Sequence, residues 1–241
     1  KKMGIEVLTL MVSIIKAIWC VLWYYFFVNK RKLDSYEICI MVFNDRLVDL
    51  NNCTPWAIPF SRNFDDLKKA ILVLCPSFFN ERAKGYYRQV SDDVLVYDGY
   101  FKFFPKEERL IKTWALFLKF FLRNIYLYRS LIGIEPLKMW VFKYYFTLLI
   151  KLSFFEALFF VNGSKILWVM NENDSETQFA AMAIHRQGGI SLGTSWSQVP
   201  LPEWNIQKNS NDVFFAWGKR MVHIRTQIQD LNYYYVVSGY P

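Results

Sequence analysis

The sequence predicts an α/β protein with a Rossmann-like parallel sheet, flanking helices and a long helical insertion that is aromatic and basic. Three observations lead to this fold class. Short apolar runs rich in β-branched residues end in loops, which is typical of buried strands. Residues 165–241 alternate strand and helix patterns, as right-handed crossovers in a parallel sheet require. Two long helical patterns lie between the early and the late strand patterns.

The composition indicates a folded chain with unusual apolar content. The chain has 241 residues, of which 54% are hydrophobic and 19% aromatic. This is ample for a core, and the aromatic share exceeds what a soluble core requires. The excess favours contact with lipid or with a broad apolar groove. The formal net charge of +8 is compatible with anionic lipid, a polyanionic polymer, a nucleotide-linked substrate or nucleic acid.

The cysteines and histidines give no sign of a metal site. The four cysteines share no CxxC spacing: Cys20, Cys39, Cys53 and Cys75. His185 and His223 belong to no HExxH or Cys/His cluster. We therefore expect no metal and a reducing, cytosolic environment. His185 is expected at a helix end near the negative pole of the dipole, and His223 at a solvated helix position.

The first segment, residues 1–32, is expected to be an apolar helix that associates with a membrane. Residues 7–28 are nearly long enough to span a bilayer. The membrane-contacting candidates here are two tryptophans and a basic flank: Trp19, Trp23, Lys30, Arg31 and Lys32. A narrow polar stripe from Lys2 to Lys16 favours a helix that lies in the interface. A spanning helix and a helix packed against the rest of the protein remain alternatives.

Residues 33–241 are expected to form the Rossmann-like domain, with a helical insertion at 102–163. Three strand patterns precede the insertion, at 36–43, 70–75 and 93–101. Within it, the pattern at 107–131 is a basic amphipathic helix. Its cations fall on one side and are further membrane candidates: Arg109, Lys112, Lys119 and Arg123. A second, apolar helix is expected from about Leu137 to Val161.

The end of the domain, residues 164–241, reads as β-α-β-β-α-β. The expected strands are 165–170, 190–196, 212–218 and 233–241, and the expected helices are 173–187 and 219–231. Gly188 and Gly189 are expected to stop the first of these helices.

Polar clusters follow three of the predicted strands. They comprise Asn44 and Asp45, then Asn171, Glu172, Asn173 and Asp174, then Thr194, Ser195, Trp196 and Ser197. In an open parallel sheet, ligands collect at the carboxyl ends of the strands. The last two clusters are therefore expected to form adjacent walls of one cleft, in which Trp196 stacks on a sugar ring or a base.

Several of these residues have a purely structural alternative. Asn173 or Asp174 serves equally well as a helix N-cap. Glu172 is not required by the cap, but it can be a solvated loop carboxylate. Trp196 can belong to the core or to an interface.

Residues 165–241 resemble the end of the N-terminal domain of GT-B glycosyltransferases of bacterial surface carbohydrate synthesis, such as capsule or O-antigen-like pathways. The resemblance rests on "NEN" after a strand, an Ala-rich helix, "GISLG", "DVFFAWG" and "VVSGYP". By resemblance, Glu172 takes the acidic position, residues 194–197 the cleft motif, and residues 239–241 the link to a second domain. Many relatives carry Gln-His-Gly at the cleft motif, and this chain lacks that histidine.

The resemblance implies transfer of a sugar from a nucleotide-sugar donor to a surface polysaccharide or a lipid-linked acceptor. Glu172 or Asp174 would accept the proton of the acceptor hydroxyl. No cofactor is expected, and the donor would bind a C-terminal nucleotide-binding domain outside these residues. The implied location is the cytoplasmic face of the bacterial inner membrane, with the protein peripheral or anchored by a single helix.

The sequence is also compared with two other function classes, of which one remains an alternative. A non-catalytic, membrane-associated scaffold or glycan-binding protein is the alternative, and the missing histidine favours it. Nucleic-acid binding is disfavoured, because the basic residues are interleaved with bulky aliphatic residues on long helices and no RRM, KH or helix-turn-helix signature is present.

Overall fold

The computed structural model describes residues 3–27, 34–41, 69–76, 91, 93–97, 107–128, 138–169, 175–194, 211–227 and 232–238. The chain divides into two compact units. Residues 1–35 and 98–163 form the helical unit, and residues 36–97 and 164–241 form the sheet unit.

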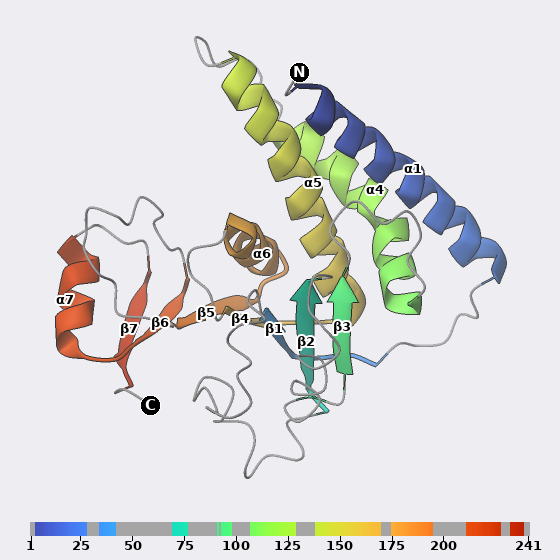
Figure 1. Cartoon of the computed structure of the whole chain (residues 1–241). Coiled ribbons are helices and arrows are strands. Elements are labelled where there is room, and N and C mark those ends of the chain that lie inside the picture. Colours follow the sequence, from blue (N-terminus) through green and yellow to red (C-terminus); the bar gives the residue numbers. More distant parts are fainter. Residues whose placement is uncertain are drawn as a thin grey trace. The chain divides into compact units, whose positions relative to one another are not determined.

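The sheet unit holds a seven-stranded sheet in which all pairings are parallel (Figure 1). Its strands are β1 (Ile38–Met41), β2 (Ile71–Pro76), β3 (Asp93–Tyr97), β4 (Ile166–Val169), β5 (Ile190–Thr194), β6 (Val213–Ala216) and β7 (Tyr234–Val237). Their order across the sheet is β3-β2-β1-β4-β5-β6-β7. The predicted α/β class, with a Rossmann-like parallel sheet and flanking helices, is confirmed.

Consecutive burial shows which strands are covered on both faces. In β2, all four residues from Ile71 to Leu74 are buried, and in β1 the run from Cys39 to Met41 is buried. Since neighbouring residues of a strand point to opposite faces, both faces of these strands are covered. Burial also raises the pKa of the Cys39 thiol well above its usual range, so this cysteine stays protonated. β7, at the edge of the sheet, is largely exposed.

Two of the described helices belong to the sheet unit. α6 (Ser175–Arg186) packs against β4 and β5, and α7 (Lys219–Gln227) packs against β6 and β7. α6 ends in the predicted glycine stop: the Gly188 N–H donates to the carbonyl of His185, and the Gly189 N–H to that of Ile184. Gly188 has a φ of 71°, which a residue with a Cβ adopts only at a cost.

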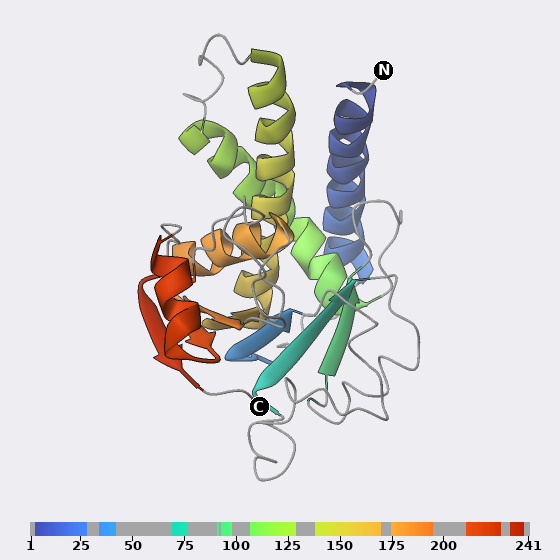
Figure 2. The same cartoon turned by 60° about the vertical axis from the view of Figure 1, so that its left-hand side comes forward.

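The described helices of the helical unit are α1 (Met3–Phe27), α4 (Glu108–Tyr128) and α5 (Lys138–Asn162). α4 packs along both α1 and α5, and α1 also contacts α5 (Figures 1 and 2). The unit has aromatic packing between α4 and α5, where Trp114 and Phe117 are fully buried and the Trp114 ring lies 5.2 Å from that of Phe154. The three helices therefore share a common apolar core.

Polar side chains are also buried between these helices. Asn124 of α4 donates to Ser153 Oγ (2.9 Å) and to Glu156 Oε2 (2.8 Å), both on α5. Arg123 forms an ion pair of 2.7 Å with the other carboxylate oxygen of Glu156, whose side chain is 0% exposed. Lys16 of α1 is buried with its Nζ atom 4.4 Å from the ring centroid of Trp114. The interior of the helical unit thus contains charged groups, each paired within the unit.

Gly189 provides a test of the close contact between α6 and the sheet. A Cβ at this position would lie 2.3 Å from the carbonyl oxygen of Lys165, which is backbone and has little freedom to move. We expect Gly189→Ala to lower the free energy of unfolding by about 1–3 kcal/mol. Chemical denaturation measures the change. Gly218→Ala is the matched control, because a Cβ there meets nothing within 4 Å, and an equal loss in both variants would contradict the expectation.

The Arg123–Glu156 pair provides a test of the helical unit. Arg123→Ala would leave the Glu156 carboxylate buried without its cation. We expect a loss of about 2 kcal/mol, below the cost at a fully buried pair because the guanidinium is partly exposed. Thermal unfolding in mild detergent is the measurement. Lys119→Ala, one turn earlier on the exposed side of α4, should change the midpoint little, and equal midpoints for both variants would show that the ion pair is dispensable.

Candidate functional site

The direction in which the chain adds strands to the sheet reverses between β1 and β4. Met41, the last residue of β1, lies in register with Val169, the last residue of β4. Val169 in turn lies in register with Gly193, next to the end of β5. From β1 the chain first builds outward through β2 and β3, and from β4 it builds in the opposite direction through β5, β6 and β7. In doubly wound sheets, this point at the carboxyl edge is where ligands bind.

One residue of the predicted site is described. Thr194 ends β5, is partly exposed, and pairs with Phe215 of β6. The other predicted catalytic and substrate-binding residues lie outside the described residues: Asn44, Asp45, Asn171, Glu172, Asn173, Asp174, Ser195, Trp196 and Ser197. That Glu172 and Trp196 face one cleft therefore stays a prediction. In the sequence, these segments follow β1, β4 and β5, which are neighbours in the sheet.

The predicted membrane residues that are described belong to the helical unit. Trp19 and Trp23 stack on each other along α1, with ring centroids 5.0 Å apart. Lys119 and Arg123 lie on the exposed side of α4. Lys30, Arg31 and Lys32 lie outside the described residues.

The other two predicted cations of α4 make contacts within the helical unit. The Arg109 guanidinium donates to the Asp34 carbonyl (2.9 Å) and to Asn162 Oδ1 (3.0 Å). Lys112 Nζ lies 6.0 Å from the ring centroid of Tyr24 on α1. Arg109 therefore ties the end of α5 to the segment that precedes the first strand.

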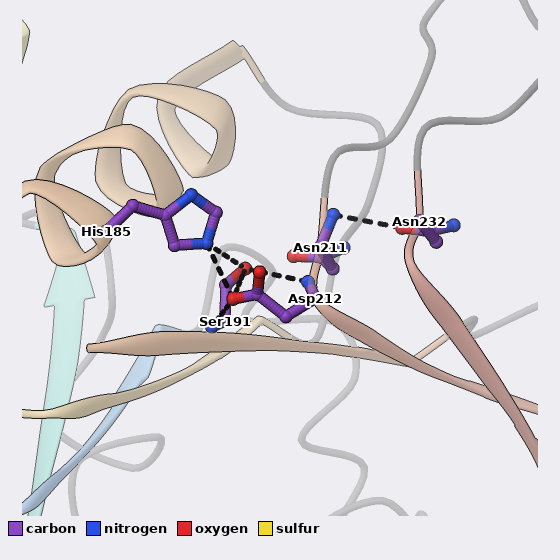
Figure 3. Close-up of polar contacts among 5 residues, drawn as sticks. All are labelled: His185, Ser191, Asn211, Asp212 and Asn232. Atoms are coloured by element: carbon purple, nitrogen blue, oxygen red, sulfur yellow. Dashed lines mark hydrogen bonds and ion pairs between the residues drawn. The ribbon is translucent and has the colours of Figure 1, made fainter. Parts of the chain in front are cut away.

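A histidine, a serine and an aspartate meet at the amino edge of the sheet (Figure 3). His185 Nε2, from the last turn of α6, lies 2.6 Å from Asp212 Oδ2 and 3.0 Å from Ser191 Oγ. The same carboxylate oxygen accepts the backbone N–H of Ser191 at 2.7 Å. Ser191 is the second residue of β5, and Asp212 directly precedes β6.

This cluster does not have the geometry of a catalytic triad. A Ser-His-Asp relay requires the serine at one ring nitrogen and the carboxylate at the other. Here Asp212 and Ser191 both face Nε2, and because a carboxylate oxygen accepts, Nε2 carries the hydrogen. Ser191 is also 0% exposed, which leaves no path for a substrate. The cluster is a structural clamp.

Further contacts at the amino edge extend the clamp to β7. The Asp212 N–H donates to the Ser191 carbonyl at 3.0 Å, and the Tyr234 N–H donates to the Asp212 carbonyl at 2.9 Å. The Asn211 N–H donates to the side-chain oxygen of Asn232 at 2.9 Å (Figure 3). The entries to three neighbouring strands are therefore joined through residues 211 and 212. Sequence reasoning placed His185 correctly at the helix end but missed its partners, because a spacing of 21 residues between Ser191 and Asp212 carries no local signal.

Comparison with known proteins yields no relative. No family model, curated protein or solved structure matches the chain. Within the described part of the chain, no three His, Cys, Asp or Glu side chains are placed to hold a metal ion. The candidate site therefore rests on the topology of the sheet and on the residues that follow its strands.

If the Asp212 cluster is purely structural, breaking it should lower the stability of the fold, and Ser191 should not react as a catalytic serine. Asp212→Ala removes the acceptor of the buried Ser191 N–H, and we expect the free energy of unfolding to fall by about 1–3 kcal/mol. Denaturant titration measures the loss. His223→Ala, at an exposed position of α7, is the control with little expected change. The structural assignment would be wrong if a fluorophosphonate probe, which modifies activated serines, labelled Ser191 in the folded chain.

Proposed function

We propose that the chain is the acceptor-side domain of a GT-B-type glycosyltransferase, which transfers a sugar from a nucleotide-sugar donor to a surface polysaccharide or a lipid-linked acceptor. The observation that carries the proposal is the reversal of strand order between β1 and β4 in an all-parallel sheet. Polar clusters of the kind that a glycan site needs follow both of these strands in the sequence. The resemblance of residues 165–241 to this enzyme class supports the same assignment.

In the proposed mechanism, a carboxylate after β4 acts as the base. Glu172 or Asp174 accepts the proton of the acceptor hydroxyl as its oxygen attacks the anomeric carbon of the donor sugar. The bond from that carbon to the nucleotide diphosphate breaks, and the diphosphate leaves with the electron pair. Thr194, Ser195 and Ser197 supply hydroxyl groups that orient the acceptor, and Trp196 supplies a flat apolar surface for a sugar ring.

The proposal assigns the chain the acceptor side because residues 165–241 resemble the end of the N-terminal domain of these enzymes. In the resembled enzymes, transfer takes place between two parallel sheets, one of which holds the nucleotide sugar. Holding both substrates together contributes roughly 7–11 kcal/mol to lowering the barrier. The donor would therefore come from a second sheet, and the reaction would run at the cytoplasmic face of a bacterial membrane.

Acceptor binding by the full chain tests this assignment. We expect short surface glycans or polyprenyl-diphosphate-linked sugars to raise the thermal midpoint, while nucleotide sugars alone leave it unchanged. Trp196→Ala should weaken acceptor binding about tenfold, which corresponds to about 1.4 kcal/mol. Calorimetric titration in mild detergent gives the dissociation constants.

Carboxylate variants separate binding from chemistry. In Glu172→Gln, the dissociation constant for the acceptor should stay within about threefold of that of the unchanged chain. The reason is that a base acts in the transition state and not in the bound complex. Glu108→Gln, at the start of α4, is the matched loss of a carboxylate outside the predicted site. Binding of nucleotide sugars with no binding of any glycan would contradict an acceptor-side role.

A further inference from the structure

α1 exposes a continuous apolar stripe. Its residues recur at intervals of three and four and so fall on one face of the helix: Leu8, Met11, Ile15, Ile18, Leu22 and Tyr25. Each is between 48% and 79% exposed. From Leu8 to Tyr25 the stripe is about 26 Å long at 1.5 Å per residue. Isolated exposed apolar residues are common on soluble proteins, but an uninterrupted stripe of this length marks an interaction surface.

The opposite face of α1 is buried and mixes polar with small apolar residues, while the large apolar residues lie outside, which differs from the usual arrangement of a soluble helix. Ser13 and Lys16 are 0% and 2% exposed, and Ala17 and Cys20 complete this inner face. Ser13 Oγ donates to the Thr9 carbonyl at 2.8 Å, and Lys16 lies over the Trp114 ring. In water, a helix gains most by turning its apolar side inward. Polar groups that are paired inside, with large apolar side chains outside, are the arrangement that hydrocarbon favours.

α5 shows that apolar composition alone does not make a helix an outward-facing, lipid-contacting one. The window Tyr145–Asn162 has a mean hydropathy of 1.4, close to the 1.6 of Leu8–Tyr25. However, 67% of the first window is buried, against 22% of the second. α5 is therefore the core helix of the unit, whereas α1 presents its apolar residues outward.

The exposed side of α4 combines cations with apolar side chains. Lys119 and Arg123 lie there beside Leu122 and Tyr126, which are 65% and 63% exposed. Such a face suits the headgroup region, where Lys119 places its stem on apolar surface and its ammonium near anionic phosphates, whereas the charge of Arg123 is balanced by Glu156. It does not suit the bilayer centre, because Lys119 lies in the middle of α4 and a cation there is costly.

We propose that the helical unit is seated in one leaflet of a membrane, with the α1 stripe among the acyl chains and the exposed side of α4 at the anionic headgroups. The occupant of the stripe is lipid, because the stripe is continuous and apolar, Ser13 and Lys16 of the same helix are buried, and the helical unit exposes Lys119 to complement anionic phosphates. The inference is independent of the proposed sugar transfer.

Flotation of the full chain with vesicles tests the inference. The chain, diluted from mild detergent, is mixed with vesicles of phosphatidylcholine that contain about one-fifth phosphatidylglycerol. A stripe variant carries Met11→Gln, Ile15→Gln and Ile18→Gln, since glutamine keeps helix propensity. We expect its partition into vesicles to fall about tenfold or more, with unchanged circular dichroism. The matched control carries Tyr233→Gln, Tyr234→Gln and Val236→Gln, which removes three exposed apolar side chains from the sheet unit, and it should float like the unchanged chain.

Two outcomes would overturn the inference. One is a stripe variant that floats as well as the unchanged chain. The other is a chain that does not bind vesicles but forms a dimer, while the stripe variant is a monomer. In that case a second copy of the chain would cover the stripe. Should the stripe variant unfold, quenching of tryptophan fluorescence by lipids brominated on their acyl chains is the second measurement. Trp23 is 39% exposed on α1 and should account for part of the quenched fluorescence. Equal quenching in the unchanged chain and in Trp23→Phe would refute lipid contact. None of these measurements involves a glycan or a nucleotide sugar, so their failure is distinct from failure of the proposed function.

Discussion

The backbone ladder between β1 and β4 is the contact on which the rest of the sheet depends. It pairs Ile38–Met41 with Ile166–Val169, segments separated by more than half of the chain. Without it, β1 with β2 and β3 would have no connection to β4 and the strands after it. A pairing of such long range is favoured only when burial on both faces offsets the entropy of closing the loop. The complete burial of Cys39, Met41 and Leu167 meets that requirement.

The two edges of the sheet have different tasks. At the amino edge, the Asp212 carboxylate joins α6, β5 and the entry to β6, and the neighbouring backbone bonds reach β7. These contacts satisfy buried polar groups and hold the strands in register. The carboxyl edge has the reversal of strand order, and the polar segments of the sequence follow the strands that end there. In the proposed function, the loops that follow the strand ends bind the ligand, while the amino edge contributes stability.

The helices and strands could be predicted from the sequence, but the strand order and the partners of individual side chains could not. Each described strand and helix lies within or close to its expected range, because apolar runs and helix stops are local signals. The strand order was not predicted, since no local pattern states which strands pair. For α1, the polar stripe was recognised, but its inward direction was not, because the partner of Lys16 is Trp114 on α4. Likewise, His185 was assigned to a helix end, while its bond to Asp212 depends on tertiary structure. The predicted site lies almost wholly outside the described residues, so its geometry is a hypothesis.

A crystal structure of the chain with a bound glycan would test the central claim most directly. We expect glycan density at the carboxyl edge, beside the ends of β1, β4 and β5, with Met41, Val169 and Thr194 among the described residues next to it. Density at the amino edge, beside Asp212 and Ser191, would contradict the account, because it would place the ligand on the edge that we assign to stability.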